Sequence, residues 1–269
     1  MTDATQVTMI GGGAMGGAII EGLLTLPDVF VTVVESDEQR AQMWSAREGV
    51  QVAALDAAVR EADAVFLAVK PHHIVDTLQA MAPSVKPGAV VVSIAAGITV
   101  ETLQAHLPAG VAVIRAMPNT PMRVGRGVVG ITPGTACSSK NVQLVTALMG
   151  SVAVVVPITE DLMDALTATS GSGPAYVFYL AEAMKSGAQD LGLPEDVATT
   201  LVCEAIMGAA HLLATDPSNA SGLRAAVTSK GGTTAAATAV FDAADLHGIV
   251  ASAMRANRDR ARELADEAR

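Results

Sequence analysis

The sequence predicts an α/β protein in which a doubly wound, mostly parallel sheet is followed by an all-helical domain. Short β-rich runs alternate with helical patterns from residue 1 to about residue 157, as expected for such a sheet. After Pro157 the strand patterns stop and only helical patterns follow. We therefore expect one domain over residues 1–157 and a second over residues 158–269.

The strands of the first domain are expected where apolar and β-branched residues gather in short runs. The runs at residues 64–69 and 89–94 are almost continuously apolar, which is typical of parallel strands buried on both faces. Helical patterns separate the first strands. The expected strands are Val7–Ile10, Phe30–Glu35, Ala64–Val69, Ala89–Ile94, Val111–Arg115, Val128–Ile131 and Ala153–Val156, and the first helices are Ala14–Leu24 and Glu38–Arg47.

The second domain is expected to consist of helices. Glu160–Thr169 is predicted as a helix, and Pro174 fits the first turn of the next one, where its missing N–H costs nothing. The helix Glu195–Ala214 carries two apolar stripes, so it is expected to be buried on several sides and to meet a partner subunit. The last helix, about His247–Glu267, mixes both charges and is typical of a solvated surface.

Composition argues against several classes of partner. The chain has 27 acidic and 17 basic residues, a net charge of −10, which disfavours nucleic acid. Its longest apolar stretches are interrupted, and Thr199–Ala214 contains Glu204 and His211, so no membrane segment is expected. Two distant cysteines indicate a reducing cytoplasm. No cysteine or histidine spacing suits a metal, so none is expected.

A glycine-rich turn carries the first functional signal. Gly11, Gly13 and Gly16 form the pattern G-x-G-x-x-G, together with Ala14 and Met15, directly after a predicted strand and at the start of a predicted helix. In this context the pattern predicts a Rossmann domain in which the turn and the helix start bind the pyrophosphate of a dinucleotide. A glycine-rich turn without a ligand is the alternative.

The end of the second strand bears on the choice between NADH and NADPH. Glu35 lies where an acidic residue commonly binds the ribose 2′-hydroxyl of NAD. Ser36 and Arg40 lie beside it and could instead contact a 2′-phosphate. The cofactor is therefore expected to be NADPH or NADH, with the preference left open.

Further segments, in order along nearly the whole chain, resemble the pyrroline-5-carboxylate reductase family. That resemblance implies reduction of the cyclic imine 1-pyrroline-5-carboxylate to L-proline with NADPH or NADH, as the last step of proline biosynthesis. It also implies that the helical domain forms a homodimer, and larger rings of dimers are common in the family. The segments are Ala68–Pro71, Ser93–Gly97, Arg115–Pro121, Ser170–Tyr176 and Gly231–Thr234.

The resemblance also implies the site residues. Thr234 and Thr167 are expected to be catalytic, and Glu160 and Thr167 would lie near the substrate across the dimer. The family usually has Ser-Pro-Gly-Gly in the substrate loop, whereas this chain has Lys230 in place of the proline, which leaves the loop geometry open. The implied substrate residues are Glu160, Gly231, Gly232, Thr233 and Thr234, and the implied cofactor residues are Ala68, Val69, Lys70, Pro71, Ala95, Ala96, Gly97, Met117 and Asn119.

Three alternatives remain. The first is a β-hydroxyacid dehydrogenase, which shares the two-domain plan. Enzymes of that family resemble one another in a lysine near the start of the first interdomain helix, placed to take an alcohol proton. Here the first lysine after Gly173 is Lys185, three turns along the helix, which counts against this alternative. Another cyclic imine reductase would differ in ring size. A regulator that binds a nicotinamide nucleotide without turnover belongs to another class, and the substrate-loop residues argue against it.

Overall fold

The structure is a computed structural model that describes residues 4–267. The chain divides into two compact units. The first comprises the chain up to Ser172 together with the segment from Asn257 onward, and the second is Gly173–Ala256. The first boundary between the two units falls between Ser172 and Gly173. The domain boundary expected from the sequence, between residues 157 and 158, stays a prediction.

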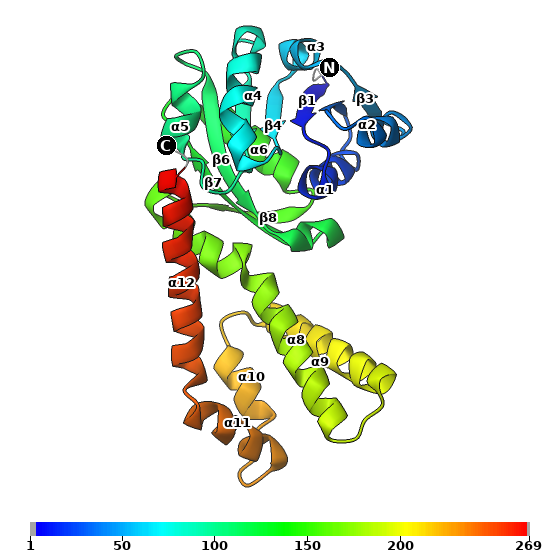
Figure 1. Ribbon diagram of the computed structural model, residues 1–269, viewed down its shortest axis with the longest axis vertical. Coiled ribbons are helices and arrows are strands. Elements are labelled where there is room, and N and C mark those ends of the chain that lie inside the picture. Colours follow the sequence, from blue (N-terminus) through cyan, green and yellow to red (C-terminus); the bar gives the residue numbers. More distant parts are fainter. Residues whose placement is uncertain (1–3, 268–269) are drawn as a thin grey trace. The chain divides into compact units, whose positions relative to one another are not determined.

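The first unit is built on an eight-stranded sheet in the order β3-β2-β1-β4-β5-β6-β7-β8 (Figure 1). The six strands from β3 to β6 are parallel to one another, β7 is antiparallel to β6, and β8 is parallel to β7. The mostly parallel sheet is therefore confirmed. The strands are β1 Thr5–Ile10, β2 Val29–Val34, β3 Val50–Val52, β4 Ala64–Leu67, β5 Val90–Ser93, β6 Ala112–Pro118, β7 Gly127–Pro133 and β8 Ala153–Pro157.

Two apolar cores cover the two faces of this sheet. Val7 and Met9 of β1 belong to one core, and Ile10 of the same strand belongs to the other, because successive side chains point to opposite faces. The helices α1 and α6 contribute to the first core, and α3, α4 and α5 contribute to the second. These helices are α1 Ala14–Leu23, α2 Glu38–Ser45, α3 Leu55–Glu61, α4 Ile74–Met81, α5 Val100–Ala105 and α6 Ser139–Met149.

The segment after β8 corrects one expectation. A continuous helix over Glu160–Thr169 is wrong: a 3₁₀ turn at Glu160–Leu162 leads into α7 (Met163–Leu166) and then a π-helical turn, Thr167–Gly171. The wider turn is closed by a hydrogen bond from Ser172 N to Thr167 O at 2.9 Å. Side chains of this segment also donate to helix carbonyls four residues back, as Thr167 does to Met163 O.

The second unit contains helices only. In this unit α8 packs along α9, and α9 contacts α10 (Figure 1). The all-helical second part of the chain is thus confirmed. The helices after α7 are α8 Gly173–Asp190, α9 Glu195–Thr215, α10 Ala220–Ala226, α11 Thr233–Ala243 and α12 Leu246–Glu267, whose last part belongs to the first unit.

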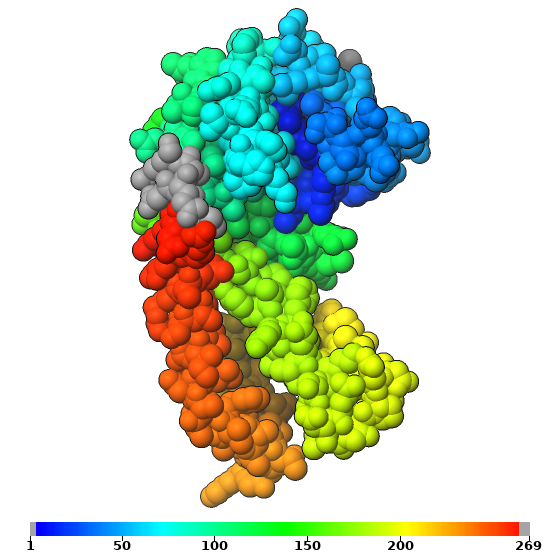
Figure 2. Space-filling model, viewed as in Figure 1, coloured from blue at the N-terminus to red at the C-terminus, as the bar shows by residue number. Residues whose placement is uncertain are grey.

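Within the single chain, this unit leaves most of its apolar side chains in contact with solvent. Ala198 and Val202 are its only buried hydrophobic residues among those described. Phe178 is 61% exposed and Leu212 is 59% exposed, and these lie on α8 and α9, the yellow-green and yellow helices of Figure 2. A unit with so small a core buries little apolar surface of its own, and exposed apolar faces of this kind are typical of subunit interfaces.

The helix α9 also corrects the expectation that its segment is too short or too polar to span a bilayer. By length and composition, Glu195–Thr215 could span one, with a mean hydropathy of 1.6 over its most apolar window. One such helix is weak evidence for a membrane, since a helix that packs against a partner subunit has the same composition.

Candidate cofactor and substrate site

The carboxyl ends of the central parallel strands lie at one edge of the sheet. Ile10 of β1 is in register with Val34 of β2 and with Leu67 of β4, and Leu67 is in register with Ser93 of β5. Ligands in such sheets bind at this edge, where the strand order reverses beside β1. The predicted cofactor residues that follow directly are Gly11, Gly13, Ala14, Met15 and Gly16 after β1, Glu35 and Ser36 after β2, Ala68, Val69, Lys70 and Pro71 after β4, and Ala95, Ala96 and Gly97 after β5.

The glycine turn has the geometry that its three motif glycines predict. Gly11 has a φ of +97°, and a Cβ there would lie 2.8 Å from the carbonyl oxygen of Ala68. A Cβ on Gly16 would lie 2.1 Å from the carbonyl oxygen of Gly11. At Gly13 the same position is open, with no atom within 4 Å. Side chains are thus excluded from the inner wall of the turn, and its outer side has room for a phosphate.

The start of α1 leaves its N–H groups available. Gly13 is the N-cap residue and no side chain caps the helix. By contrast, Asp37 caps α2 and Ser138 caps α6 with their side chains. Uncapped N–H groups at the positive end of a helix dipole are a suitable site for an anion. These features fit the pyrophosphate of a dinucleotide.

Glu35 is bound on all sides by groups of the protein itself. One carboxylate oxygen accepts from Gly12 N at 2.9 Å and Arg40 Nε at 3.1 Å, and the other from Asp37 N at 3.0 Å and Arg40 Nη2 at 3.2 Å. Burial alone would raise the pKa of Glu35, but these hydrogen bonds and the positive charge of Arg40 lower it to about 2. The contact of Glu35 with a ribose stays a prediction.

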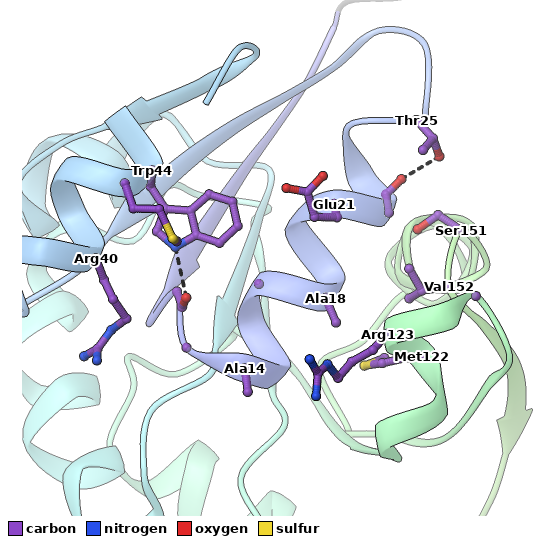
Figure 3. Close-up of a pocket in the computed structure, with 16 residues that line it drawn as sticks. Ala14, Ala18, Glu21, Thr25, Arg40, Trp44, Met122, Arg123, Ser151 and Val152 are labelled. Atoms are coloured by element: carbon purple, nitrogen blue, oxygen red, sulfur yellow. Dashed lines mark hydrogen bonds between the residues drawn. The ribbon is translucent and has the colours of Figure 1, made fainter. Parts of the chain in front are cut away.

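The residue that sequence reasoning missed here is Trp44, the only tryptophan of the chain. It lies on α2 and is 5% exposed, and its indole Nε1 donates to Gly12 O at 2.9 Å (Figure 3). Trp44 and Arg40 on one side and Met122 and Arg123 on the other line an open groove of about 600 Å³ along α1. The signal was a single large aromatic residue in a chain with few aromatics.

The other predicted cofactor segments lie at the surface or around backbone turns. Lys70 is exposed and begins a short 3₁₀ turn with Pro71 at its first position. Ala95 is buried, Ala96 is exposed, and Gly97 has a φ of +78°. Their contacts with the cofactor stay predictions.

Beyond the end of β6, Asn119 is 7% exposed and both ends of its amide are engaged. Its Nδ2 donates to Ser170 O at 2.9 Å, and its Oδ1 accepts from Val128 N at 2.8 Å. The side chain therefore ties the π-helical turn to β7. Met117, on β6, approaches the same turn, since its Cε would lie 3.2 Å from a Cβ placed on Gly171. A role for either residue at the nicotinamide stays a prediction.

Glu160 takes part in an ion pair that the sequence analysis did not anticipate. Arg115, in the middle of β6 and 4% exposed, donates to Glu160 Oε1 at 2.5 Å. The other carboxylate oxygen, Oε2, is buried and has no hydrogen-bond partner among the described residues. An arginine inside an apolar strand was the available signal, because a buried charge requires a partner.

The predicted substrate loop lies in the second unit. Gly231 has a φ of +72°, and Gly232 is the N-cap of α11 without any side-chain cap. Thr233 and Thr234 are exposed in the first turn of this helix, and Lys230 is exposed before it. The free N–H groups again suit an anion, here a carboxylate. The roles of these residues, and of Thr167, stay predictions.

Among the described residues, no group of three or more His, Cys, Asp or Glu side chains could hold a metal ion.

A glycine turn of this geometry at the switch point of a doubly wound sheet defines a dinucleotide-binding Rossmann protein, here joined to a helical unit with an incomplete core. The comparisons agree. Residues 6–97 match the family model described as NADP oxidoreductase coenzyme F420-dependent, and residues 160–264 match that of pyrroline-5-carboxylate reductase dimerisation. The chain belongs to the pyrroline-5-carboxylate reductase family, and it is oligomeric through this helical region.

Individual relatives are similar over almost their whole length. The chain is 36% identical to a pyrroline-5-carboxylate reductase of Corynebacterium melassecola, covering 97% of this chain and 98% of the relative. It is 35% identical to that of Pseudomonas aeruginosa, covering 97% of both. The solved structure of the Coxiella burnetii reductase is 31% identical, with a TM-score of 0.92 over 97% of this chain and 98% of that chain.

Proposed function

We propose that this protein reduces 1-pyrroline-5-carboxylate to L-proline with NADPH or NADH, as the final step of proline biosynthesis. The observation that carries the proposal is the similarity to curated reductases of that name across 97% of the chain, through both the Rossmann domain and the helical domain. A shared Rossmann domain alone would support only nucleotide binding.

The reaction makes modest demands on side chains. When bound, NAD(P)H supplies the hydride that adds to the imine carbon. Protonation of the imine nitrogen makes this carbon electrophilic, so the protein needs to hold the substrate and orient its ring beside the nicotinamide. In our proposal the glycine turn Gly11–Gly16 binds the pyrophosphate, which fixes the cofactor for that transfer.

The substrate carboxylate is proposed to bind at the start of α11. The N–H groups of the first turn, after Gly231 and Gly232, are uncapped by any side chain. Thr234 is exposed in the first turn of α11, and its hydroxyl can donate to a neutral imine nitrogen or accept from a protonated one. Glu160 and Thr167 are proposed to contact the substrate across the dimer.

The assembly proposed is a homodimer through the helical domain, with larger rings built from dimers. The exposed apolar side chains of α8 and α9 support this, because burying them requires a second subunit. We also propose that the protein works in the cytoplasm, since its two cysteines are both unpaired.

The alternatives are less well supported. In a β-hydroxyacid dehydrogenase a lysine of the helix after Gly173 would take the alcohol proton. Here Lys185 instead pairs with Glu195 at 2.8 Å in the second unit, so its ammonium is engaged in an ion pair. A binding protein without turnover would not need an uncapped substrate loop in a second domain.

A steady-state assay tests the proposal. The purified protein should oxidise NADPH or NADH only when the cyclic imine is added, and running both cofactors gives their preference. Oxidation of the cofactor with a 3-keto acid and none with the imine would favour the dehydrogenase. Tight cofactor binding without turnover of either substrate would favour the regulator.

A further inference from the structure

Both main-chain polar groups of Gly12 are held by side chains from other elements. Gly12 N donates to Glu35 Oε2 at 2.9 Å, and Gly12 O accepts from Trp44 Nε1 at 2.9 Å. Gly12 lies between the first two glycines of the motif, Gly11 and Gly13, so these bonds act on the turn that faces the phosphates. Figure 3 shows the indole of Trp44 reaching the turn from α2.

The indole also fills the space behind the turn. A Cβ on Gly12 would lie 2.2 Å from Trp44 Nε1, and a Cβ on Gly17 would lie 3.1 Å from Trp44 Cζ2. Trp44 belongs to the core cluster that covers this face of the sheet, so the ring has little freedom to move away. A phenylalanine ring could fill much of the same space, but it has no N–H donor for the Gly12 carbonyl.

Glu35 completes the arrangement from the other side. Its carboxylate has about four acceptor directions, and the N–H groups of Gly12, Asp37 and Arg40 occupy four. Its pKa of about 2 keeps the carboxylate ionised throughout the neutral range. The bond to Gly12 N is therefore always available, independent of ordinary changes in pH.

We propose that Trp44 is a positioning residue for the cofactor: with Glu35 it holds Gly12 so that the N–H groups at the start of α1 face outward before the nucleotide binds. The inference rests on the proposed function, since it requires a dinucleotide at this turn. A turn that is ordered in advance pays less conformational entropy on binding, so the effect should appear in cofactor affinity.

The matched variants are Trp44→Phe and Leu148→Ala. Trp44→Phe keeps an aromatic ring in the core but removes the donor, which leaves the Gly12 carbonyl without its partner. Leu148, on α6, is 2% exposed in the same core cluster and does not line the groove, so its truncation costs packing without touching the turn. Both variants should lower the melting temperature, because each removes buried contacts of the core cluster.

The dissociation constants of NADH and NADPH are measured for each protein by cofactor fluorescence, alongside kcat and KM. Trp44→Phe should raise both dissociation constants about ten-fold, while kcat at saturating cofactor and KM for the imine change less than about two-fold. Leu148→Ala should leave the dissociation constants unchanged. Equal cofactor affinity in Trp44→Phe and wild type would overturn the inference. A wild type that binds neither cofactor would overturn the proposed function and the inference with it.

The wild-type protein supplies a second test that does not depend on a variant folding. A single tryptophan gives a single indole N–H signal in a nitrogen-correlated NMR spectrum. In the free protein this proton should exchange slowly with deuterated water, because it is buried and bound to Gly12 O. Fast exchange in the free protein, with protection only after NAD(P)H is added, would show that the turn is not ordered in advance.

Discussion

Replacing Glu35 by glutamine should lower the free energy of unfolding at neutral pH. In acid, the difference between the variant and the wild type should be much smaller. The pKa of Glu35 is about 2 in the folded protein against an ordinary value of 4.5. Because the folded value is the lower one, the stabilisation is complete above the ordinary pKa of 4.5 and is lost as pH falls through about 2. The side chain is 4% exposed, so solvent screens this interaction little.

The magnitude follows from the size of that shift. Each pKa unit corresponds to about 1.36 kcal/mol, so the ionised carboxylate contributes about 3 kcal/mol to the free energy of unfolding at pH 7. At pH 3 the same two pKa values leave about 1.4 kcal/mol. The glutamine side chain cannot ionise, so the difference between the two proteins should shrink over this range.

Urea unfolding at pH 7, 5, 4 and 3, with the protein concentration held fixed because the chain is oligomeric, measures that difference. Glu21→Gln is the matched control: Glu21 pairs with Arg47 but its side chain is 50% exposed, so the loss should be about 0–1 kcal/mol. A difference between wild type and Glu35→Gln that is equal at every pH would refute the reasoning, because the stabilisation would then not come from the charge.

Variants at three further positions test other parts of the structure. Gly16→Ala should raise the dissociation constant of NAD(P)H at least ten-fold with its helical circular dichroism retained, because the new Cβ would lie 2.1 Å from a backbone oxygen of the turn. Thr234→Ala should lower kcat/KM for the imine by about ten- to a hundred-fold with little change in cofactor affinity, and Thr234→Ser should keep most of the activity; a loss of cofactor affinity instead would place the loop at the nucleotide. Leu201 is 54% exposed on α9, and Leu201→Asp should give a monomer in sedimentation at low concentration and no activity in the steady-state assay. A monomer that is still active would refute the proposed interface.

The parts of the fold that sequence could predict are those fixed by local pattern. The runs that became β4 and β5 are buried on both faces, which favours apolar residues at nearly every position; the one polar residue in these two strands is Ser93, at the carboxyl end of β5. The turn at Gly11–Gly16 was predictable because a Cβ on Gly11 or Gly16 would clash with nearby backbone, and a tight strand–turn–helix unit creates such close approaches wherever it occurs. Short elements were missed: β3 has only three residues and depends on its pairing with β2.

The contacts that sequence could not predict join residues far apart in the chain. Glu35 was singled out by its position at the end of the second strand, but nothing local indicates that Gly12, 23 residues earlier, would donate to one of its carboxylate oxygens. The bond from Trp44 to Gly12 spans 32 residues, and that from Arg115 to Glu160 spans 45. The prediction of one continuous helix over Glu160–Thr169 was wrong because the backbone hydrogen bonds change from 3₁₀ to α and then to π spacing within a few residues. The apolar pattern of the segment shows no such change.

The most direct test of the account follows the hydride itself. NADH and NADPH labelled with deuterium at the transferable position are incubated with the protein and 1-pyrroline-5-carboxylate, and the product is examined by mass spectrometry and chiral chromatography. The account predicts L-proline that carries one deuterium at the former imine carbon, formed in equal amount to the oxidised cofactor. Cofactor oxidation without labelled proline, or no turnover by a protein that binds the cofactor, would contradict it.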